Sequence, residues 1–211
     1  MKFVIKGPLP GLNELIEAER RNRYLGAQLK KKCETVVMHA ARQLGNVEFE
    51  EPVYMIHLCF VCDPYPTGYD TSTTRAVIKV IKESGNHVQI LTKGDGSRDF
   101  DLLDKNDWYG ITYDGSNIGP YAPSDRLIDL YSAKQCGIST WVSCEPVLNP
   151  HGVIEMLSEC HDIIDKVKIG KLNYHPSNID WKQFGRDVEQ LCQRLWLDYY
   201  IKDSLRKEME G

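Results

Sequence analysis

The chain lacks the long apolar segments that membrane insertion requires. No apolar run approaches the roughly 20 residues of a membrane-spanning helix, and there is no tandem repeat or low-complexity linker. The first 14 residues show neither a long apolar stretch nor a small-residue cleavage site, so we predict no secretory signal. With 42% hydrophobic and 27% charged residues, the sequence is typical of a soluble globular protein, and we expect it in the cytoplasm.

The cysteines do not form the pattern of a disulfide-stabilised scaffold. There are seven of them, an odd number, and their spacing is scattered along 211 residues. Secreted disulfide scaffolds are usually short and carry an even number of cysteines. We therefore expect free thiols.

Charge is distributed unevenly along the chain. Residues 1–45 hold nine Lys or Arg and four Asp or Glu, a net charge of +5, whereas the whole chain carries −4. The remainder therefore carries −9. A basic first segment followed by an acidic body suggests two parts with different histories or partners, and nucleic acid is a candidate partner of the basic part. The alternative for a single cluster such as Lys30-Lys31-Lys32 is a solvated helix face.

Hydrophobic periodicity predicts an α/β protein. The first segment is predicted to contain a strand at 2–6 and a helix over 27–44. Strands are then predicted at 53–60, 87–92, 108–113, 139–144 and 166–170, with helices at 71–84, 99–103, 124–136, 151–160 and from 179 to about 207. This alternation implies parallel strands joined by right-handed crossovers, which both a barrel and an open doubly wound sheet would satisfy.

Polar side chains are expected at the end of each predicted strand of the body. Asp63 follows the first strand, Lys93 the second and Glu145 the fourth, and Thr112 lies at the end of the third. Lys171, Asn173 and His175 follow the fifth strand. Because strand-to-helix loops of a parallel sheet share one edge, these side chains predict a ligand pocket there.

Residues 56–207 resemble the radical SAM enzymes related to spore photoproduct lyase. The resemblance rests on CDPYPTGYDTSTTRAVIKVIKESGNHVQILTKG (62–94), ITYDG (111–115), GISTWVSCEPVL (137–148) and KIGKLNYH (168–175). It implies a partial parallel (β/α) barrel, here 53–207, that matches the family from its second βα unit onward and lacks the first. It also implies S-adenosylmethionine as a ligand across the strand ends.

The same resemblance assigns roles to four residues. Asp63 would bind the methionine amino group and Lys93 its carboxylate, while Thr112 and Glu145 would stand at polar positions of the next strands. An amino-acid zwitterion needs one anion and one cation, which agrees with the first two roles.

The [4Fe-4S] cluster of the family has no evident ligands in this sequence. Radical SAM enzymes bind it through three cysteines spaced CxxxCxxC, and that spacing is absent. Cys59 and Cys62 form the nearest pair, but they straddle the end of a strand and no third cysteine is close. We therefore expect a cluster-free S-adenosylmethionine-binding protein or an inactive remnant.

Residues 1–52 resemble the start of RusA-type Holliday-junction resolvases, which are common in phage. The resemblance rests on MKFVIKGPLPGLNELIEAERRNRYLGAQLKKK and implies binding of branched DNA and Mg²⁺-dependent cleavage. The aspartate run of such enzymes does not follow the strand at 53–60. Arg98-Asp99-Phe100-Asp101 has a similar appearance, but a short helix there would turn its carboxylates apart. The alternative function is thus that of a DNA-junction-binding protein or an endodeoxyribonuclease. We interpret the chain as a fusion of two truncated parts. Its first segment could occupy the position of the missing barrel unit.

Overall fold

The computed structural model describes residues 54–58, 62–116 and 123–210. The chain divides into two compact units, Met1–Pro52 and Val53–Gly211, and all the described residues belong to the second. The strand, the helix and the RusA-like resemblance predicted within residues 1–52 lie outside the described residues, and so does Cys59. They stay predictions, as does the absence of a first βα unit.

The described residues form one six-stranded parallel sheet flanked by helices. The strands are β1 (Met55–Leu58), β2 (His87–Thr92), β3 (Trp108–Thr112), β4 (Ser139–Cys144), β5 (Lys166–Ile169) and β6 (Asp198–Ile201). The helices are α3 (Ser72–Glu83), α4 (Pro123–Gln135), α5 (Pro150–Cys160), α6 (Trp181–Arg194) and α7 (Asp203–Glu210), with short 3₁₀ helices η1 (Ser97–Leu102) and η2 (His161–Ile163).

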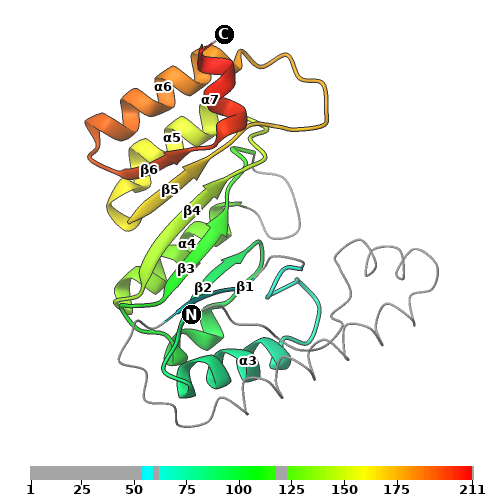
Figure 1. Ribbon diagram of the computed structural model, residues 1–211, viewed down its shortest axis with the longest axis vertical. Helices are drawn as coiled ribbons and strands as arrows, with labels where there is room; N and C mark the ends of the chain where they lie inside the picture. The colour runs from blue at the N-terminus through cyan, green and yellow to red at the C-terminus, as the bar shows by residue number, and fades with distance from the viewer. Residues whose placement is uncertain (1–53, 59–61, 117–122, 211) are drawn as a thin grey trace, which may run out of the picture. The chain divides into compact units, whose positions relative to one another are not determined.

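The strand order decides between the two architectures that the sequence left open. Each strand pairs in parallel with the next one in the chain, in the order β1-β2-β3-β4-β5-β6, without a reversal. Right-handed crossovers between successive neighbours place all the connecting helices on one face, and Figure 1 shows the strands following one another beside these helices. The fold is therefore a partial parallel (β/α) barrel, as predicted, and not a doubly wound sheet.

The two faces of the sheet differ in chemistry. The helix-covered outer face carries the hydrophobic core, including Val88, Ile90, Tyr109, Ile111, Val142, Val167 and Ile169, all fully buried. The alternate positions, on the inner face, carry mostly polar side chains. Burial of the outer face against amphipathic helices supplies the main driving force for folding, since each large aliphatic side chain contributes roughly 1.5–3 kcal/mol.

The end of the chain differs from the prediction. A single helix was expected from 179 to about 207, but α6 ends at Arg194 and a short strand, β6, follows before α7. Trp196 adopts a left-handed backbone (φ 57°) at the position where a helix-ending glycine usually stands. Because no glycine stands there, the sequence carries no signal for the end of the helix. The predicted helix therefore extends over the β-favouring residues Tyr199-Tyr200-Ile201.

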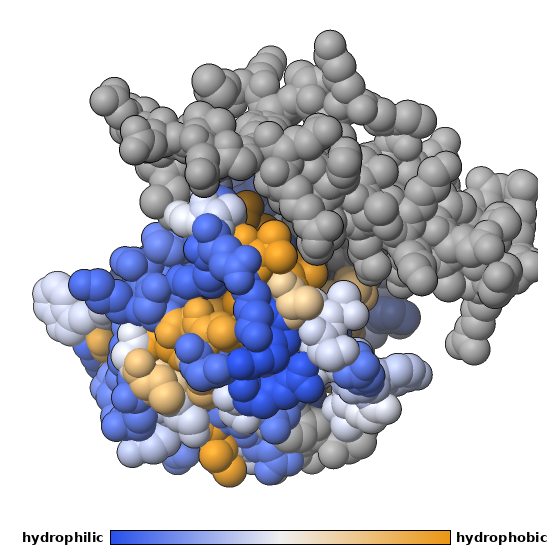
Figure 2. Space-filling model, turned by 90° about the horizontal axis from the view of Figure 1, so that it is seen from below, coloured by the Kyte–Doolittle hydropathy of each residue, from blue (hydrophilic) through white to orange (hydrophobic). Residues whose placement is uncertain are grey.

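None of the helices in the described part of the chain is long and apolar enough to cross a membrane. On the face of the described part shown in Figure 2, hydrophilic residues form a broad band and apolar residues lie in separate patches between them.

Candidate ligand site at the carboxyl edge of the sheet

The parallel strand order brings the carboxyl ends of all six strands to one edge. Asp63 follows β1, Lys93 directly follows Thr92 at the end of β2, and Thr112 is the last residue of β3. Glu145 directly follows the last residue of β4. The four residues predicted from the sequence therefore belong to the same edge of one sheet.

The carboxylate of Asp63 joins the ends of β1 and β2. Its Oδ1 accepts hydrogen bonds from the Tyr65 N–H (2.9 Å) and the Thr92 hydroxyl (2.5 Å), and its Oδ2 accepts one from the Lys93 N–H (2.7 Å). Thr92 is buried, Asp63 is half-buried and Lys93 is exposed. The hydrogen bond between Asp63 and Lys93 uses the backbone N–H of Lys93 and does not involve its ammonium group.

The three hydrogen-bond donors do not occupy every acceptor position of the Asp63 carboxylate. An ionised carboxylate offers about four lone-pair positions, and within the described residues Oδ2 accepts one hydrogen bond, from the Lys93 N–H. The Asp63 side chain is thereby held in one orientation with an acceptor position remaining. It lies beside the backbone of the exposed residue Lys93, at the neighbouring strand end.

Thr112 lies deeper than the other three residues. It is only 6% exposed, and it shares the inner face with Ser143 of β4, its direct partner in the sheet. The carbonyl of Thr112 accepts a hydrogen bond from the guanidinium of Arg126 in α4 (2.8 Å). Thr112 and Ser143 together provide two hydroxyl groups at the inner side of the edge.

Glu145 belongs to a second polar cluster, at the ends of β4, β5 and β6. Its carboxylate forms an ion pair with Lys202, which follows β6, and accepts a hydrogen bond from the Asn173 amide (3.1 Å). Burial lowers the pKa of Lys202. A Cβ atom at Gly170 would come within 2.7 Å of Glu145 Oε1, so this glycine leaves the room that the carboxylate occupies. None of the hydrogen bonds within the described ranges joins Glu145 to Asp63 or Lys93.

Sequence analysis did not find Lys202, because the strand that positions it was read as helix. Once β6 is recognised, the residue directly after a parallel strand is expected at the carboxyl edge. Asn173 was predicted at this edge, but its partner Glu145 is separated from it by 28 residues and could not be inferred from spacing.

An open hollow of about 480 Å³ lies beside the Glu145 cluster. It is formed by the loop after β5 and the start of α6, and it is lined by Lys171, Leu172, Asn173, Tyr174, His175, Pro176, Ser177 and Trp181. Lys171 is paired with Glu208 of α7, and Tyr174 has a left-handed backbone (φ 64°) and a fully exposed ring. Lys171, Asn173 and His175, the polar residues that follow the fifth strand, are thus among the residues that line this hollow.

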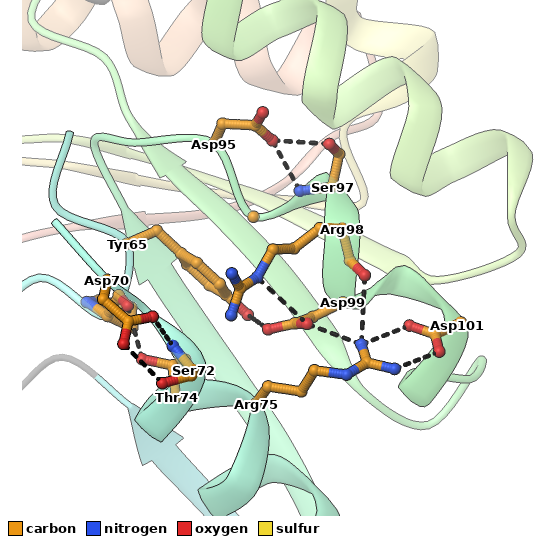
Figure 3. Close-up of polar contacts among 12 residues, drawn as sticks. Tyr65, Asp70, Ser72, Thr74, Arg75, Asp95, Ser97, Arg98, Asp99 and Asp101 are labelled. Carbon is orange, nitrogen blue, oxygen red and sulfur yellow. Dashed lines mark hydrogen bonds and ion pairs between the residues drawn. The ribbon is translucent and has the colours of Figure 1, made fainter. Parts of the chain in front are cut away.

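The Asp99 and Asp101 carboxylates are not a metal pair. Both accept hydrogen bonds from the Arg75 guanidinium, at 2.7 and 2.8 Å, and Asp99 also accepts one from the Tyr65 hydroxyl at 3.0 Å (Figure 3). The hydrogen bond from Arg75 lowers the pKa of Asp101. Asp99 is fully buried, and this network ties the loop after β1 to η1. The short helix predicted there is present, and a cation already neutralises its carboxylates.

The described residues do not fit a [4Fe-4S] cluster. Within them, no group of three His, Cys, Asp or Glu side chains is arranged to hold a metal ion. Cys62 is exposed, and the described cysteines are all free thiols. Burial raises the pKa of Cys144, and it raises that of Cys192 to about 12, which opposes formation of the thiolate that iron needs.

Comparisons with known proteins yielded distant structural likenesses only. No protein-family model and no curated protein matches the chain. Among solved structures it is similar to SuiB of Streptococcus suis bound to S-adenosylmethionine (13% identity, TM-score 0.37, covering 90% of this chain and 61% of that one). It is also similar to SuiB bound to its precursor peptide SuiA (12%, 0.39, 86% and 56%), and to lysine/ornithine decarboxylase of Vibrio vulnificus complexed with cadaverine (13%, 0.38, 62% and 42%).

The chain spans between 42% and 61% of the length of these proteins. Similarity this distant assigns neither a family nor a ligand. The barrel assignment rests instead on the strand order and pairing.

Proposed function

We propose that the partial barrel binds S-adenosylmethionine at the carboxyl edge of its sheet without cleaving it by cluster chemistry. The observation that carries the proposal is the Asp63–Lys93 pair. An α-amino acid presents an ammonium and a carboxylate on one carbon. Asp63 and Lys93 are an acidic and a basic residue at adjacent strand ends, joined by the hydrogen bond from the Lys93 backbone N–H to Asp63 Oδ2. The sequence resemblance to radical SAM enzymes supplies the identity of the ligand.

Asp63 is suited to bind the ligand ammonium because its orientation is already fixed. Donors from Tyr65, Thr92 and Lys93 hold the carboxylate in place, so little further ordering is needed when a ligand arrives. The remaining acceptor position on Oδ2 would take one N–H of the ammonium.

Lys93 would bind the carboxylate of the same moiety. The hydrogen bond from its N–H to Asp63 fixes the backbone of Lys93. The Lys93 side chain is exposed and can rotate toward the ligand. Thr112 and Glu145 would contribute further along the edge, Thr112 through its hydroxyl and Glu145 through the carboxylate held by Lys202 and Asn173. No residue of the described chain is assigned a covalent step.

Calorimetric titration of the full chain with S-adenosylmethionine tests the proposal. Lys93→Ala should weaken binding at least tenfold, because a charge-assisted hydrogen bond contributes roughly 1.5–3 kcal/mol. Lys105→Ala is the matched control, since Lys105 is an exposed lysine at the opposite, amino-terminal end of β3. Equal affinity of the wild type and Lys93→Ala would refute the assigned role, and no binding to the wild type would reduce the barrel to a fold without this ligand.

A further inference from the structure

The open hollow of about 480 Å³ after β5 is not used by the proposed S-adenosylmethionine site, and two aromatic side chains line it. Tyr174 comes from the loop between β5 and α6, and Trp181 is the first residue of α6. Figure 1 shows this loop reaching outward from the sheet. A concavity of this size is suited to a small molecule.

Trp181 is held in a fixed position beside the hollow. Its indole Nε1–H donates to Ser177 Oγ (3.1 Å), and its ring meets Phe184 edge-on, with centroids 6.1 Å apart and planes at 75°. Phe184 belongs to the buried core, so the indole is held against the core. Trp181 is itself half-buried and lines the hollow, so it offers a ligand a preformed aromatic surface at little cost in ordering.

Tyr174 has a strained backbone and a ring surrounded by water. Its φ of 64° lies in the left-handed region that residues other than glycine rarely adopt, and its side chain is fully exposed. Strain of this kind is concentrated at ligand sites. Trp196 shares both features, with a φ of 57° and 94% exposure, but it lies in the turn before β6 and does not line the hollow. The two residues therefore form a matched pair for experiment.

The charged groups around the hollow already have partners. Lys171, which lines it, forms an ion pair with Glu208 of α7, and Glu145 beside it forms one with Lys202. The carboxylate of Asp180 caps the first turn of α6. An ionic ligand would have to compete with one of these groups, whereas a neutral ligand leaves all of them in place. The charge distribution therefore favours a neutral ligand.

Polar groups other than these charges also line the hollow. They are the Tyr174 hydroxyl, the His175 imidazole and the Ser177 hydroxyl. Ser177 Oγ accepts the bond from Trp181, which leaves its own O–H as a donor. Within the described ranges, no hydrogen bond to another part of the protein engages the side chain of Tyr174 or His175. These groups are exposed and can bond to a ligand in exchange for water.

We infer that the hollow binds a neutral sugar through one pyranose ring. The faces of a pyranose carry C–H groups, whose slightly positive hydrogens are attracted to the negative face of an aromatic ring, here Trp181 and Tyr174. Its edge carries hydroxyls that both donate and accept, which matches the groups of His175 and Ser177. The site is separate from the Asp63–Lys93 pair and is tested without S-adenosylmethionine, so either proposal can fail alone.

The test is a titration of the full chain with methyl β-D-glucopyranoside, methyl β-D-galactopyranoside and methyl α-D-mannopyranoside, each on its own. Binding is followed through the indole N–H resonance of Trp181, which is identified by its absence in Trp181→Phe. At least one glycoside should shift this resonance saturably, with a dissociation constant on the order of 1 mM, since a small ligand with few contacts binds weakly. The indole resonance of Trp196 should stay unchanged.

Tyr174→Asn should weaken binding about fivefold, because it removes one aromatic face and asparagine tolerates the left-handed backbone. Trp196→Asn is the matched control and should leave binding unchanged, since it makes the same kind of change at a left-handed, exposed position outside the hollow. His175→Ala, also at an exposed position, should weaken binding about threefold through loss of a hydrogen bond. Circular dichroism checks that each variant is folded.

The inference is overturned if none of the three glycosides shifts the Trp181 resonance saturably, or if Tyr174→Asn and Trp196→Asn change binding equally. The methyl glycosides of glucosamine and glucuronic acid test the choice of a neutral ligand. If either binds about tenfold tighter than the neutral glycosides, the hollow is a site for an ammonium or a carboxylate group instead. A tetraproline peptide that shifts Trp181 when no glycoside does would replace the sugar by a peptide.

Discussion

The indole of Trp141 occupies the space that a side chain at Gly110 would need. A Cβ atom placed on Gly110 would come within 2.1 Å of Trp141 Nε1, a distance that non-bonded atoms do not tolerate. The glycine and the tryptophan are direct partners in neighbouring strands, so each determines what the other position accepts. The position of the indole over β3 therefore depends on the absence of a side chain at Gly110.

Gly110→Ala should destabilise the protein by about 1–3 kcal/mol, because it overpacks a site that cannot relax without moving the indole. The displacement would also break the hydrogen bond to the Ile90 carbonyl. Trp141→Phe is the comparison, since it removes that bond while keeping a ring, and about 1 kcal/mol is expected. Urea unfolding measures both; a neutral Gly110→Ala would contradict the packing described.

Asp63→Ala should destabilise the protein, whereas Lys93→Ala should not. Removing the carboxylate takes the 2.5 Å acceptor from the buried Thr92 hydroxyl, at about 1–3 kcal/mol, whereas the exposed Lys93 N–H can bond to water instead. The Lys93 side chain is exposed, and its truncation leaves that N–H in place. Thermal unfolding of the two variants distinguishes them, and equal midpoints would argue against the bracing role of Asp63.

Tyr65→Phe should cost about 1–3 kcal/mol, because the buried Asp99 carboxylate loses the hydroxyl that donates to its Oδ2. Tyr65 is 2% exposed, so water cannot replace the lost donor. Tyr69→Phe removes a hydroxyl from a ring that is 77% exposed and should have no measurable effect. Chemical denaturation of the pair checks this, and similar losses in both would contradict it.

The Lys134–Asp165 ion pair should make stability depend on pH on the acid side. Burial alone would raise the pKa of Asp165, but hydrogen bonds from Lys134 (2.5 Å) and from the Thr140 N–H (2.8 Å) outweigh it and lower the pKa. A carboxyl group whose pKa is depressed on folding stabilises the folded state above its ordinary pKa, near 3.8, and loses that contribution as the pH falls through the lower folded value.

The difference in unfolding free energy between wild type and Lys134→Met should accordingly be largest near neutral pH and shrink below about pH 4. Urea unfolding at several pH values measures it. A difference that stays constant from pH 7 to pH 3 would show that Lys134 acts through packing and not through charge.

The basic first segment predicts salt-sensitive binding of four-way DNA junctions by the full chain. Phosphate contacts release counterions, so each neutralised phosphate adds about −0.9 to the slope of log affinity against log salt concentration. That slope should become less steep in a triple variant that combines Lys30→Ala, Lys31→Ala and Lys32→Ala. A flat salt response, measured by fluorescence anisotropy, would exclude this partner for the segment.

Much of the barrel was predictable because each of its first five strands combines β-branched or aromatic residues with a clear break. Strand Ser139–Cys144 was predicted with its observed limits, and the limits of the strand at 87–92 also agree. The sixth strand was missed since Trp196 takes the left-handed conformation that a glycine would have signalled. Because Lys202 directly follows the sixth strand, this ion-pair partner of Glu145 was missed as well.

The candidate site was predictable in location but not in detail. Parallel strands fix which edge a loop belongs to, so Asp63, Lys93, Thr112 and Glu145 could be assigned to one edge from order alone. Which atoms meet depends on rotamers and register, and nothing in the spacing indicated that Asp63 would accept the backbone N–H of Lys93. The polar inner face was likewise hidden, because alternation within five-residue strands does not show which face the helices cover.

The most direct test of the Asp63–Lys93 proposal changes the ligand and the protein together. Calorimetry would compare S-adenosylmethionine with its decarboxylated analogue, for the wild type and for Lys93→Met. The wild type should prefer S-adenosylmethionine at least tenfold, and Lys93→Met should bind the two ligands within about twofold of each other, since the partner of the carboxylate is gone. A preference that persists unchanged in Lys93→Met would show that another group recognises the carboxylate.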